Sequence, residues 1–349
     1  MIATTATPRR VTTAEPDQLA DVRLRLMGTR IRIVVGRPAT PGLPTADEAA
    51  AEVAAMLADY DARLSRFRTG SEICALNADP RRTVPASALL RSAIAAALEA
   101  AEHSGGLVDP ACLDALEAAG YRESWDGARR VGLGEALAAV AQPRRPAAPH
   151  PDFAWTRIEI DDRAGTITRP PGMRLDTGGS GKGHAADLAS APLTGYEHWA
   201  VDVGGDVRLG GTAGLVRDVE IEDPFTGGTI DVLRLRAGAV ATSGVRSRIW
   251  RDADGVVGHH LLDPAGGLPA FTGLVAATAL APTAVEAEAL AKAAILAGPS
   301  GALRVLARHG GLTVDEDGAV ARIGRLEPAP RVRLRRPAGA RGLPTGSAP

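Results

Sequence analysis

The alternation of apolar and polar residues near the start of the chain predicts a pair of strands. Residues 22–26 and 31–35 both alternate, and Gly28 lies between them, where a tight turn favours a residue without a Cβ atom. The same kind of run is found at residues 157–160, 166–168, 199–203, 219–221, 230–235 and 274–280. The first two of these runs flank Gly165, which can take the positive φ of a hairpin turn.

Apolar residues at helical spacing predict three helices. Thr45 and Glu48 match a capping box, and apolar positions then recur at helical spacing over residues 53–64. A second helix is expected at about residues 86–103, and a third at about residues 283–297, where Thr283 and Glu286 repeat the capping pattern. Strands and helices are mixed without a regular βαβ alternation. This favours an α+β fold over a doubly wound sheet.

The composition is that of an ordinary globular protein and excludes several classes of partner. Of 349 residues, 45% are hydrophobic and 23% are charged, but only 3% are aromatic. So few rings argue against stacking on single-stranded nucleic acid. A formal net charge of −1 gives no electrostatic reason to bind DNA or an anionic membrane. The two cysteines, Cys74 and Cys112, form no CxxC pair, so a structural zinc site or a disulfide framework is not expected.

The two ends of the chain differ in composition from the rest. Residues 1–20 are polar, and residues 326–349 are basic and rich in Pro and Gly, so both segments are expected to be disordered. Residues 21–325 should form one large domain, with a loop at 142–151. No apolar run follows the early arginines, and no stretch reaches the length of a membrane span. We therefore expect a cytoplasmic protein that does not insert into membranes.

The glycine-rich segment 175–187 carries the clearest chemical signal. Its glycines allow the backbone to approach a ligand closely, and backbone N–H groups at the start of a following helix favour a phosphate. Lys182 adds a mobile positive charge. A Walker A loop is excluded because Gly183, and not Ser or Thr, follows Lys182, and because Asp176 stands where that motif needs a glycine.

Two other interpretations of this segment remain open from the residues alone. Gly181, Gly183 and Ala186, with Asp202 about twenty residues later, formally match a dinucleotide fingerprint. Arg174 and Asp176 interrupt the apolar strand which that motif requires, and so argue against it. The segment could also be a glycine-rich turn that binds no ligand.

Two further segments are weaker taken singly. His259 and His260 precede an apolar pair, and a histidine near neutral pKa can accept a proton from an attacking hydroxyl, although structural histidines are common. Glu288 and Lys292 lie four residues apart on the third helix. Their spacing is that of an ordinary surface ion pair, which is the simplest interpretation of it.

Taken in order, these segments resemble the FAD:protein FMN transferase family, also called ApbE-like flavin transferases. Seven stretches carry the resemblance: residues 27–29 (MGT), 71–77 (SEICALN), 105–110 (GGLVDP), 175–187, 203–206 (VGGD), 242–244 (TSG) and 260–264 (HLLDP). Each is weak alone, but seven in the family's order are specific. The similarity extends from about residue 24 to residue 298.

The resemblance implies a fold and a reaction. The fold is α+β, with mixed, mostly antiparallel sheets, flanking helices and a flavin cleft between two intertwined subregions. In the reaction, a Ser or Thr hydroxyl of an acceptor flavoprotein attacks the FMN phosphorus of FAD, and AMP leaves. A divalent cation, usually Mg²⁺, offsets the charge of the pyrophosphate. The alternatives are a FAD-binding protein without transfer activity and a FAD pyrophosphatase.

The resemblance also assigns residues to roles. His260 and Asp263 match the positions associated with catalysis. The positions associated with flavin binding are Met27, Gly28, Thr29, Asn77, Gly106, Val108, Asp109, Asp176, Gly178, Gly179, Lys182, His184, Thr242, Ser243 and Leu261. The metal positions correspond to Gly181, Glu288 and Lys292.

This sequence departs from the family pattern at several of these positions. At the metal site Glu288 stands for Asp and Lys292 for Thr, and a protonated lysine cannot ligate a cation. His184 stands where the family often has Tyr, and Val108 replaces Phe. Flavin binding is therefore better supported by the sequence than metal-dependent transfer.

Overall fold

An eight-stranded sheet runs through the protein, in a computed structural model that describes residues 11–12, 20–124, 131–140, 143–251 and 255–324. Its strands are β2 (Ala20–Leu26), β3 (Thr29–Val35), β7 (Trp199–Val203), β8 (Asp206–Gly210), β11 (Gly238–Gly244), β16 (Leu274–Ala281), β17 (Gly311–Asp315) and β18 (Val320–Ile323). The order is β18-β17-β16-β11-β8-β7-β3-β2, and all seven pairings are antiparallel. This confirms the predicted fold class.

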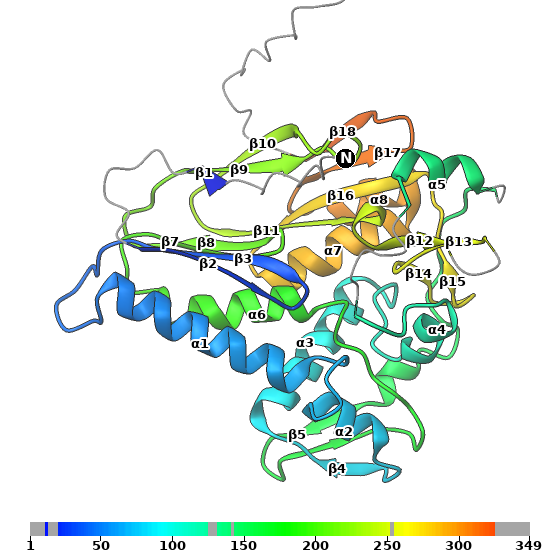
Figure 1. The fold of residues 1–349 in the computed structure, drawn as a ribbon, viewed down its shortest axis with the longest axis horizontal. Helices are drawn as coiled ribbons and strands as arrows, with labels where there is room; N and C mark the ends of the chain where they lie inside the picture. Colours follow the sequence, from blue (N-terminus) through cyan, green and yellow to red (C-terminus); the bar gives the residue numbers. More distant parts are fainter. Residues whose placement is uncertain (1–10, 13–19, 125–130, 141–142, 252–254, 325–349) are drawn as a thin grey trace, which may run out of the picture.

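Helices cover one face of this sheet (Figure 1). They are α1 (Ala46–Leu64) against β2 and β3, α6 (Gly181–Ser190) against β7 and β8, and α7 (Ala284–Leu296) against β11 and β16. Two more, α3 (Ala88–His103) and α8 (Gly298–Leu306), pack on α7. All thirteen residues of α7 are buried, because neighbours surround this helix on every side. The charged groups that α7 carries are therefore inside the protein.

Smaller elements extend the fold beyond the large sheet. Below it in Figure 1, β4 (Thr83–Pro85), β6 (Thr166–Thr168) and β5 (Glu159–Asp161) form a three-stranded sheet beside α2 (Glu72–Ala78). Two short hairpins, β12–β13 (Ile249–Arg251, Val257–His259) and β14–β15 (Leu262–Asp263, Leu268–Pro269), lie near α4 (Leu113–Ala118) and α5 (Leu133–Ala139). A further hairpin consists of β9 (Arg217–Glu222) and β10 (Thr229–Leu235).

Most of the predicted local features are present. The turn between β2 and β3 places both Met27 and Gly28 at positive φ, and Gly165 has a φ of 69°. Thr45 and Glu48 cap α1 reciprocally. The second predicted box is only half formed: Thr283 accepts from the backbone N–H of Glu286, but the Glu286 carboxylate bonds to His309 instead. A tertiary partner has replaced the local one.

Two predictions on element boundaries need correction. The strand expected at 157–160 begins only at Glu159, because residues Ala154–Arg157 form a short 3₁₀ helix that ends before the pairing with β6. Within 1–20, expected to be disordered, Val11–Thr12 forms strand β1 on the open edge of β9, and Ala20 begins β2. The rest of 1–20, the tail 326–349 and position 142 of the predicted loop lie outside the described residues.

Candidate active site

The glycine-rich segment forms a turn that leads directly into α6. Leu175, at the start of this segment, is held by two hydrogen bonds from the side chain of Asn77. The Asn77 amide donates to the Leu175 carbonyl (2.8 Å) and accepts from the Leu175 N–H (2.7 Å). The helix begins at Gly181. A Cβ atom on Gly183 would lie 2.4 Å from the Ala284 carbonyl oxygen, so only glycine lets α6 approach the start of α7 this closely.

This turn borders a cleft with two lobes. The smaller lobe has a cavity volume of about 100 Å³ and the larger of about 390 Å³, and both are lined by Tyr121, Asp176, Gly178 and Arg248. The smaller lobe is also lined by Leu107, Val108, Asp109, Cys112, Gly179, Ser180, His260, Leu261, Lys292 and Leu296. The larger is also lined by Met27, Gly28, Tyr60, Arg66, Arg68, Gly181 and Lys182. Residues far apart in the sequence thus meet at one place.

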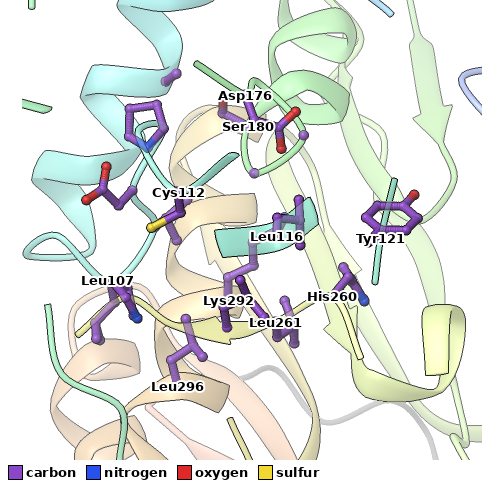
Figure 2. A pocket seen from close by; sticks show the side chains of 18 of the residues that line it. Leu107, Cys112, Leu116, Tyr121, Asp176, Ser180, His260, Leu261, Lys292 and Leu296 are labelled. Atoms are coloured by element: carbon purple, nitrogen blue, oxygen red, sulfur yellow. The ribbon is translucent and has the colours of Figure 1, made fainter. Parts of the chain in front are cut away.

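Figure 2 shows the smaller lobe from close by. Lys292 comes from α7, His260 from the segment between β13 and β14, and Ser180 from the glycine-rich turn. Apolar side chains such as Leu261 and Leu296 share the same wall. The lobe therefore combines an apolar surface with a few polar groups, as small-molecule sites commonly do.

A cluster of four buried or half-buried charges lies under the turn. Glu288 is fully buried; its carboxylate accepts from Lys292 Nζ (2.6 Å) and the Gly183 N–H (2.8 Å), and lies 3.4 Å from Lys182 Nζ. Lys182 also contacts the buried carboxylate of Asp206. The i,i+4 spacing had suggested a surface pair of Glu288 and Lys292. The ion pair is present, but the prediction that it lies on the surface is wrong, because other elements enclose α7 and bury the pair.

Electrostatics favour the charged forms of Glu288 and Lys182, whereas burial lowers the pKa of Lys292 and raises that of Asp206 to about 6. Burial raises the pKa of Glu288, but the two lysines and the Gly183 N–H outweigh it and lower that pKa to about 2. Burial lowers the pKa of Lys182, yet Asp206 and Glu288 raise it overall. For Lys292 burial prevails, and the pKa lies below its usual value despite the neighbouring carboxylate. The carboxylate is thus ionised at neutral pH.

The residues at the predicted metal position do not fit a divalent cation. The Gly181 carbonyl already accepts from the Tyr60 hydroxyl (3.1 Å), and the Glu288 carboxylate is engaged by Lys292. Two unit charges 4 Å apart interact by about 4 kcal/mol at an effective dielectric of 20, so an ammonium here would repel a cation. Among the described residues, no group of three or more His, Cys, Asp or Glu side chains is placed to hold a metal.

His260 lines the smaller lobe, and its neighbour His259 is fully buried. The His260 Nδ1 atom and the His259 Nε2 atom have no hydrogen-bond partner in the part of the chain that the structure describes. Burial, together with the positive charge of Arg248, lowers the pKa of His260 well below 6.5. Burial lowers the pKa of His259 to about 4. His260 is therefore neutral at physiological pH and can accept a proton, although as a weak base.

Asp263 lies close to His260 in sequence but is engaged elsewhere. Its carboxylate accepts from the backbone N–H groups of Ala148 (2.9 Å) and Ala265 (3.2 Å). These bonds tie the loop after residue 143 to the β14–β15 hairpin. The carboxyl group is not among the groups that line either lobe of the cleft.

Several other predicted flavin-binding residues do not line either lobe of the cleft. Thr242 bonds to Thr278 between neighbouring strands (2.9 Å), and Thr29 packs against Gly204. His184 faces a separate cavity next to α3, where its ring bonds to Tyr60 (3.1 Å) and Ser92 (2.8 Å). Ser243, Gly106 and Asn77 also lie outside the lining. Their roles in flavin binding stay predictions.

The structure adds residues which sequence analysis did not select. Arg248 lines both lobes, and its guanidinium lies 5.6 Å from the centre of the Tyr121 ring. Arg66 lies 4.6 Å from the same ring on the side of the larger lobe. Arg248 follows the Thr242–Gly244 motif by four residues, which was the only signal for it in the sequence.

The dinucleotide interpretation is excluded by the topology. The segment before the turn is not a strand, and β7, which contains Asp202, pairs antiparallel with both of its neighbours. Within the described residues, no parallel βαβ unit surrounds the glycines, whereas that fingerprint requires one.

Comparisons with known proteins agree on one family. The model of the ApbE family matches residues 27–314. A FAD:protein FMN transferase of Treponema pallidum (strain Nichols) is 30% identical over 292 residues, which cover 77% of this chain and 75% of that protein. A protein of the same name from Rhodobacter capsulatus is 31% identical over 62% of this chain and 40% of its own length.

Solved structures show the same fold. The ApbE protein of Thermotoga maritima superposes with a TM-score of 0.69 at 28% identity, over 87% of this chain and 96% of that one. The apo form of the flavinyl transferase ApbE from Pseudomonas stutzeri gives a TM-score of 0.69 at 23% identity, over 89% and 96% of the two chains, and supports the fold alone. No helix among the described residues is both long and apolar enough to span a membrane.

Proposed function

This chain belongs to the ApbE family, and we propose that it is a FAD:protein FMN transferase. In the proposed reaction, a Ser or Thr hydroxyl oxygen of an acceptor flavoprotein bonds to the FMN phosphorus of FAD. The phosphoanhydride bond to AMP breaks, AMP leaves, and the hydroxyl proton passes to a base. The acceptor keeps FMN through a phosphoester. The relative from Treponema pallidum, similar over most of both chains, bears that activity as its name.

The observation that supports this proposal is a two-lobed cleft with positively charged side chains where the lobes meet. FAD has two bulky ends joined by a charged pyrophosphate, and it needs two cavities connected by a region that accepts anions. Arg248 lines both lobes, and the glycine-rich turn with Lys182 borders them. Gly181 and Lys182, the first residues of α6, line the larger lobe, so the positive end of the helix dipole also favours an anion there. We place the pyrophosphate here and the two ends of FAD in the lobes.

We assign proton removal to His260. Its ring lines the smaller lobe, and its Nδ1 atom lacks a partner among the described residues, so it can accept the proton of an incoming hydroxyl. Arg248 lies close enough to depress the pKa of His260. The same guanidinium can stabilise the negative charge that develops on the phosphate oxygens. Asp263, in this proposal, positions the β14–β15 hairpin, which follows the histidine in the chain.

Gly181, Glu288 and Lys292 do not form a fitting site for the expected Mg²⁺, so the proposed reaction does not use this cation. The same misfit favours a second candidate function, in which the protein binds or hydrolyses FAD without transferring FMN. In hydrolysis, water takes the place of the acceptor hydroxyl, and FMN and AMP are both released. The acceptor protein and the cytoplasmic location also stay predictions, which co-purification and cell fractionation would test.

The test is incubation of the full chain with FAD and a candidate flavoprotein acceptor, with AMP and protein-bound flavin measured together. Equal amounts of AMP and covalently flavinylated acceptor are expected, and an acceptor with its target Ser or Thr changed to Ala should remain unlabelled. AMP with free FMN and no labelled acceptor would favour the hydrolase. No AMP, but saturable quenching of flavin fluorescence, would leave a FAD-binding protein.

A further inference from the structure

Lysine is rare in this chain, and both copies lie at the same place. Of the 40 lysine and arginine residues, only Lys182 and Lys292 are lysines. Both ammonium groups lie within 3.4 Å of the same Glu288 oxygen. Each also lines one lobe of the cleft: Lys182 the larger and Lys292 the smaller. An ammonium is a compact point charge that fits a narrow site where the planar guanidinium of arginine does not.

Lys292 is held in a fixed position. Its side chain is only 9% exposed, and its ammonium donates to Glu288 at 2.6 Å. Glu288 is itself anchored by the N–H of Gly183, the residue that starts the close contact between α6 and α7. An ammonium has three N–H donors, and one of them serves Glu288. The remaining donors are available to an anion in the lobe that Lys292 lines.

We propose that Lys292 is a built-in counter-charge for the FAD pyrophosphate and replaces the divalent cation at this position, so that FAD binds without metal. This inference rests on the proposed FAD site. Arg248, which lines both lobes, would contact the same anion from the opposite wall, and Lys182 would approach it from the larger lobe. Three positive charges then surround the pyrophosphate, and the Lys292 ammonium would repel a divalent cation placed beside it.

The first experiment needs no variant. FAD is titrated into the full chain in EDTA and in millimolar Mg²⁺, and the dissociation constant is read from quenching of flavin fluorescence. We expect the two constants to agree within about threefold, because the counter-charge is part of the protein. A dissociation constant that improves tenfold or more with Mg²⁺ overturns the proposal and leaves FAD binding intact. If FAD fails to bind in either buffer, both the proposed function and this inference fall.

The second experiment removes the charge. Lys292→Met shortens the side chain by only one atom, and Glu288 retains Lys182 and the Gly183 N–H as partners, so the fold should persist. We expect FAD to bind about ten- to a hundredfold more weakly in EDTA, the loss typical of a hydrogen bond to a charged group. Riboflavin, which has no phosphate, should bind the variant and the parent equally. A variant that loses both ligands to the same extent points to a damaged pocket and contradicts a specific phosphate contact.

The matched control is Glu286→Gln on the same helix, which removes a buried charge two residues from Glu288 but lines neither lobe. FAD affinity should be unchanged in this control.

The variant Lys292→Thr adds a complementary test, because it removes the ammonium and introduces a hydroxyl oxygen. We expect Mg²⁺ to strengthen its FAD binding by more than in the parent. Equal metal dependence of Lys292→Thr and the parent would contradict the replacement of a cation by Lys292.

Discussion

The two walls of the cleft differ in whether a buried polar group has a hydrogen-bond partner within the protein. On the wall formed by α6 and α7, every carboxylate oxygen of Glu288 already has a partner from within the protein. On the wall that includes Arg248 and His260, the His260 Nδ1 atom is buried and has no partner among the described residues. Burial of an unsatisfied nitrogen costs free energy, whereas burial of a fully paired carboxylate costs much less.

This difference separates two tasks within one site. The paired wall is rigid and charged, and it can hold an anion without rearranging. The histidine wall keeps an unused proton acceptor, which becomes satisfied only when a substrate arrives. Unsatisfied buried groups are rare in folded proteins and often mark functional positions. The comparison predicts that substitutions on the first wall mainly change stability or binding, and that substitutions on the second mainly change the rate.

The largest effect is expected for His260→Ala. Removal of a general base typically slows a reaction by about 10² to 10⁴-fold. FAD affinity should change little, because the charges around the pyrophosphate remain. Single-turnover measurement of AMP release, together with FAD titration, checks this prediction. If the variant has the parent's rate, His260 has only a structural role, and the proposed difference between the two walls is wrong.

On the other wall, Glu288→Ala should cost about 3–5 kcal/mol of unfolding free energy, since it leaves two lysines near a buried site without their shared carboxylate. Urea unfolding measures the effect. The control is Glu286→Ala, whose carboxylate has His309 as its partner at a less buried position (3.0 Å). Similar losses for the two variants would show that the cluster under the turn has no special stability.

The same carboxylate predicts an acid limit of stability. The pKa of Glu288 in the folded protein is lowered from 4.5 to about 2, so its contribution is fully present above pH 4.5 and is lost as the pH falls towards 2. Glu288→Ala should lack this part of the acid loss, and the stability difference between the two proteins should shrink below pH 4.5. A difference that stays constant down to pH 3 would contradict the lowered pKa.

Asn77→Leu should have an intermediate effect. Both hydrogen bonds that hold Leu175 in front of the glycine-rich turn are lost, which costs about 1–3 kcal/mol. Because the turn then becomes mobile, FAD should also bind more weakly. Thr83→Val is the control: it breaks a bond to Thr168 in the remote three-stranded sheet, and FAD affinity should not respond. If the Asn77 variant loses stability but keeps its FAD affinity, the glycine-rich turn does not contribute to FAD binding.

Asp263→Asn should have the smallest effect. The amide oxygen can still accept from Ala148 and Ala265, so both stability and the transfer rate should change by no more than about 1 kcal/mol in free energy. The rate of AMP release and the melting temperature measure the two quantities. A loss of rate comparable to that of His260→Ala would instead assign Asp263 a direct part in proton transfer.

The sequence by itself determined the local elements and the order of the motifs. Alternation and capping predicted the β2–β3 hairpin, α1, α3 and α7 to within a few residues, because these signals depend on near neighbours along the chain. The motifs also indicated the family, which the comparisons confirmed. The strand order could not be predicted in this way, since it depends on which distant strands pair.

Only the tertiary structure decided the environment of each site residue. Glu288 and Lys292 had the spacing of a surface pair, but α7 is enclosed, so the pair is buried beneath the turn. Arg248 had no distinctive signal, yet it lies where both lobes meet. Burial and charge at a point in space are set by residues that are remote in sequence. The local pattern therefore predicts which groups are present, and only the packing of the elements determines what those groups can do.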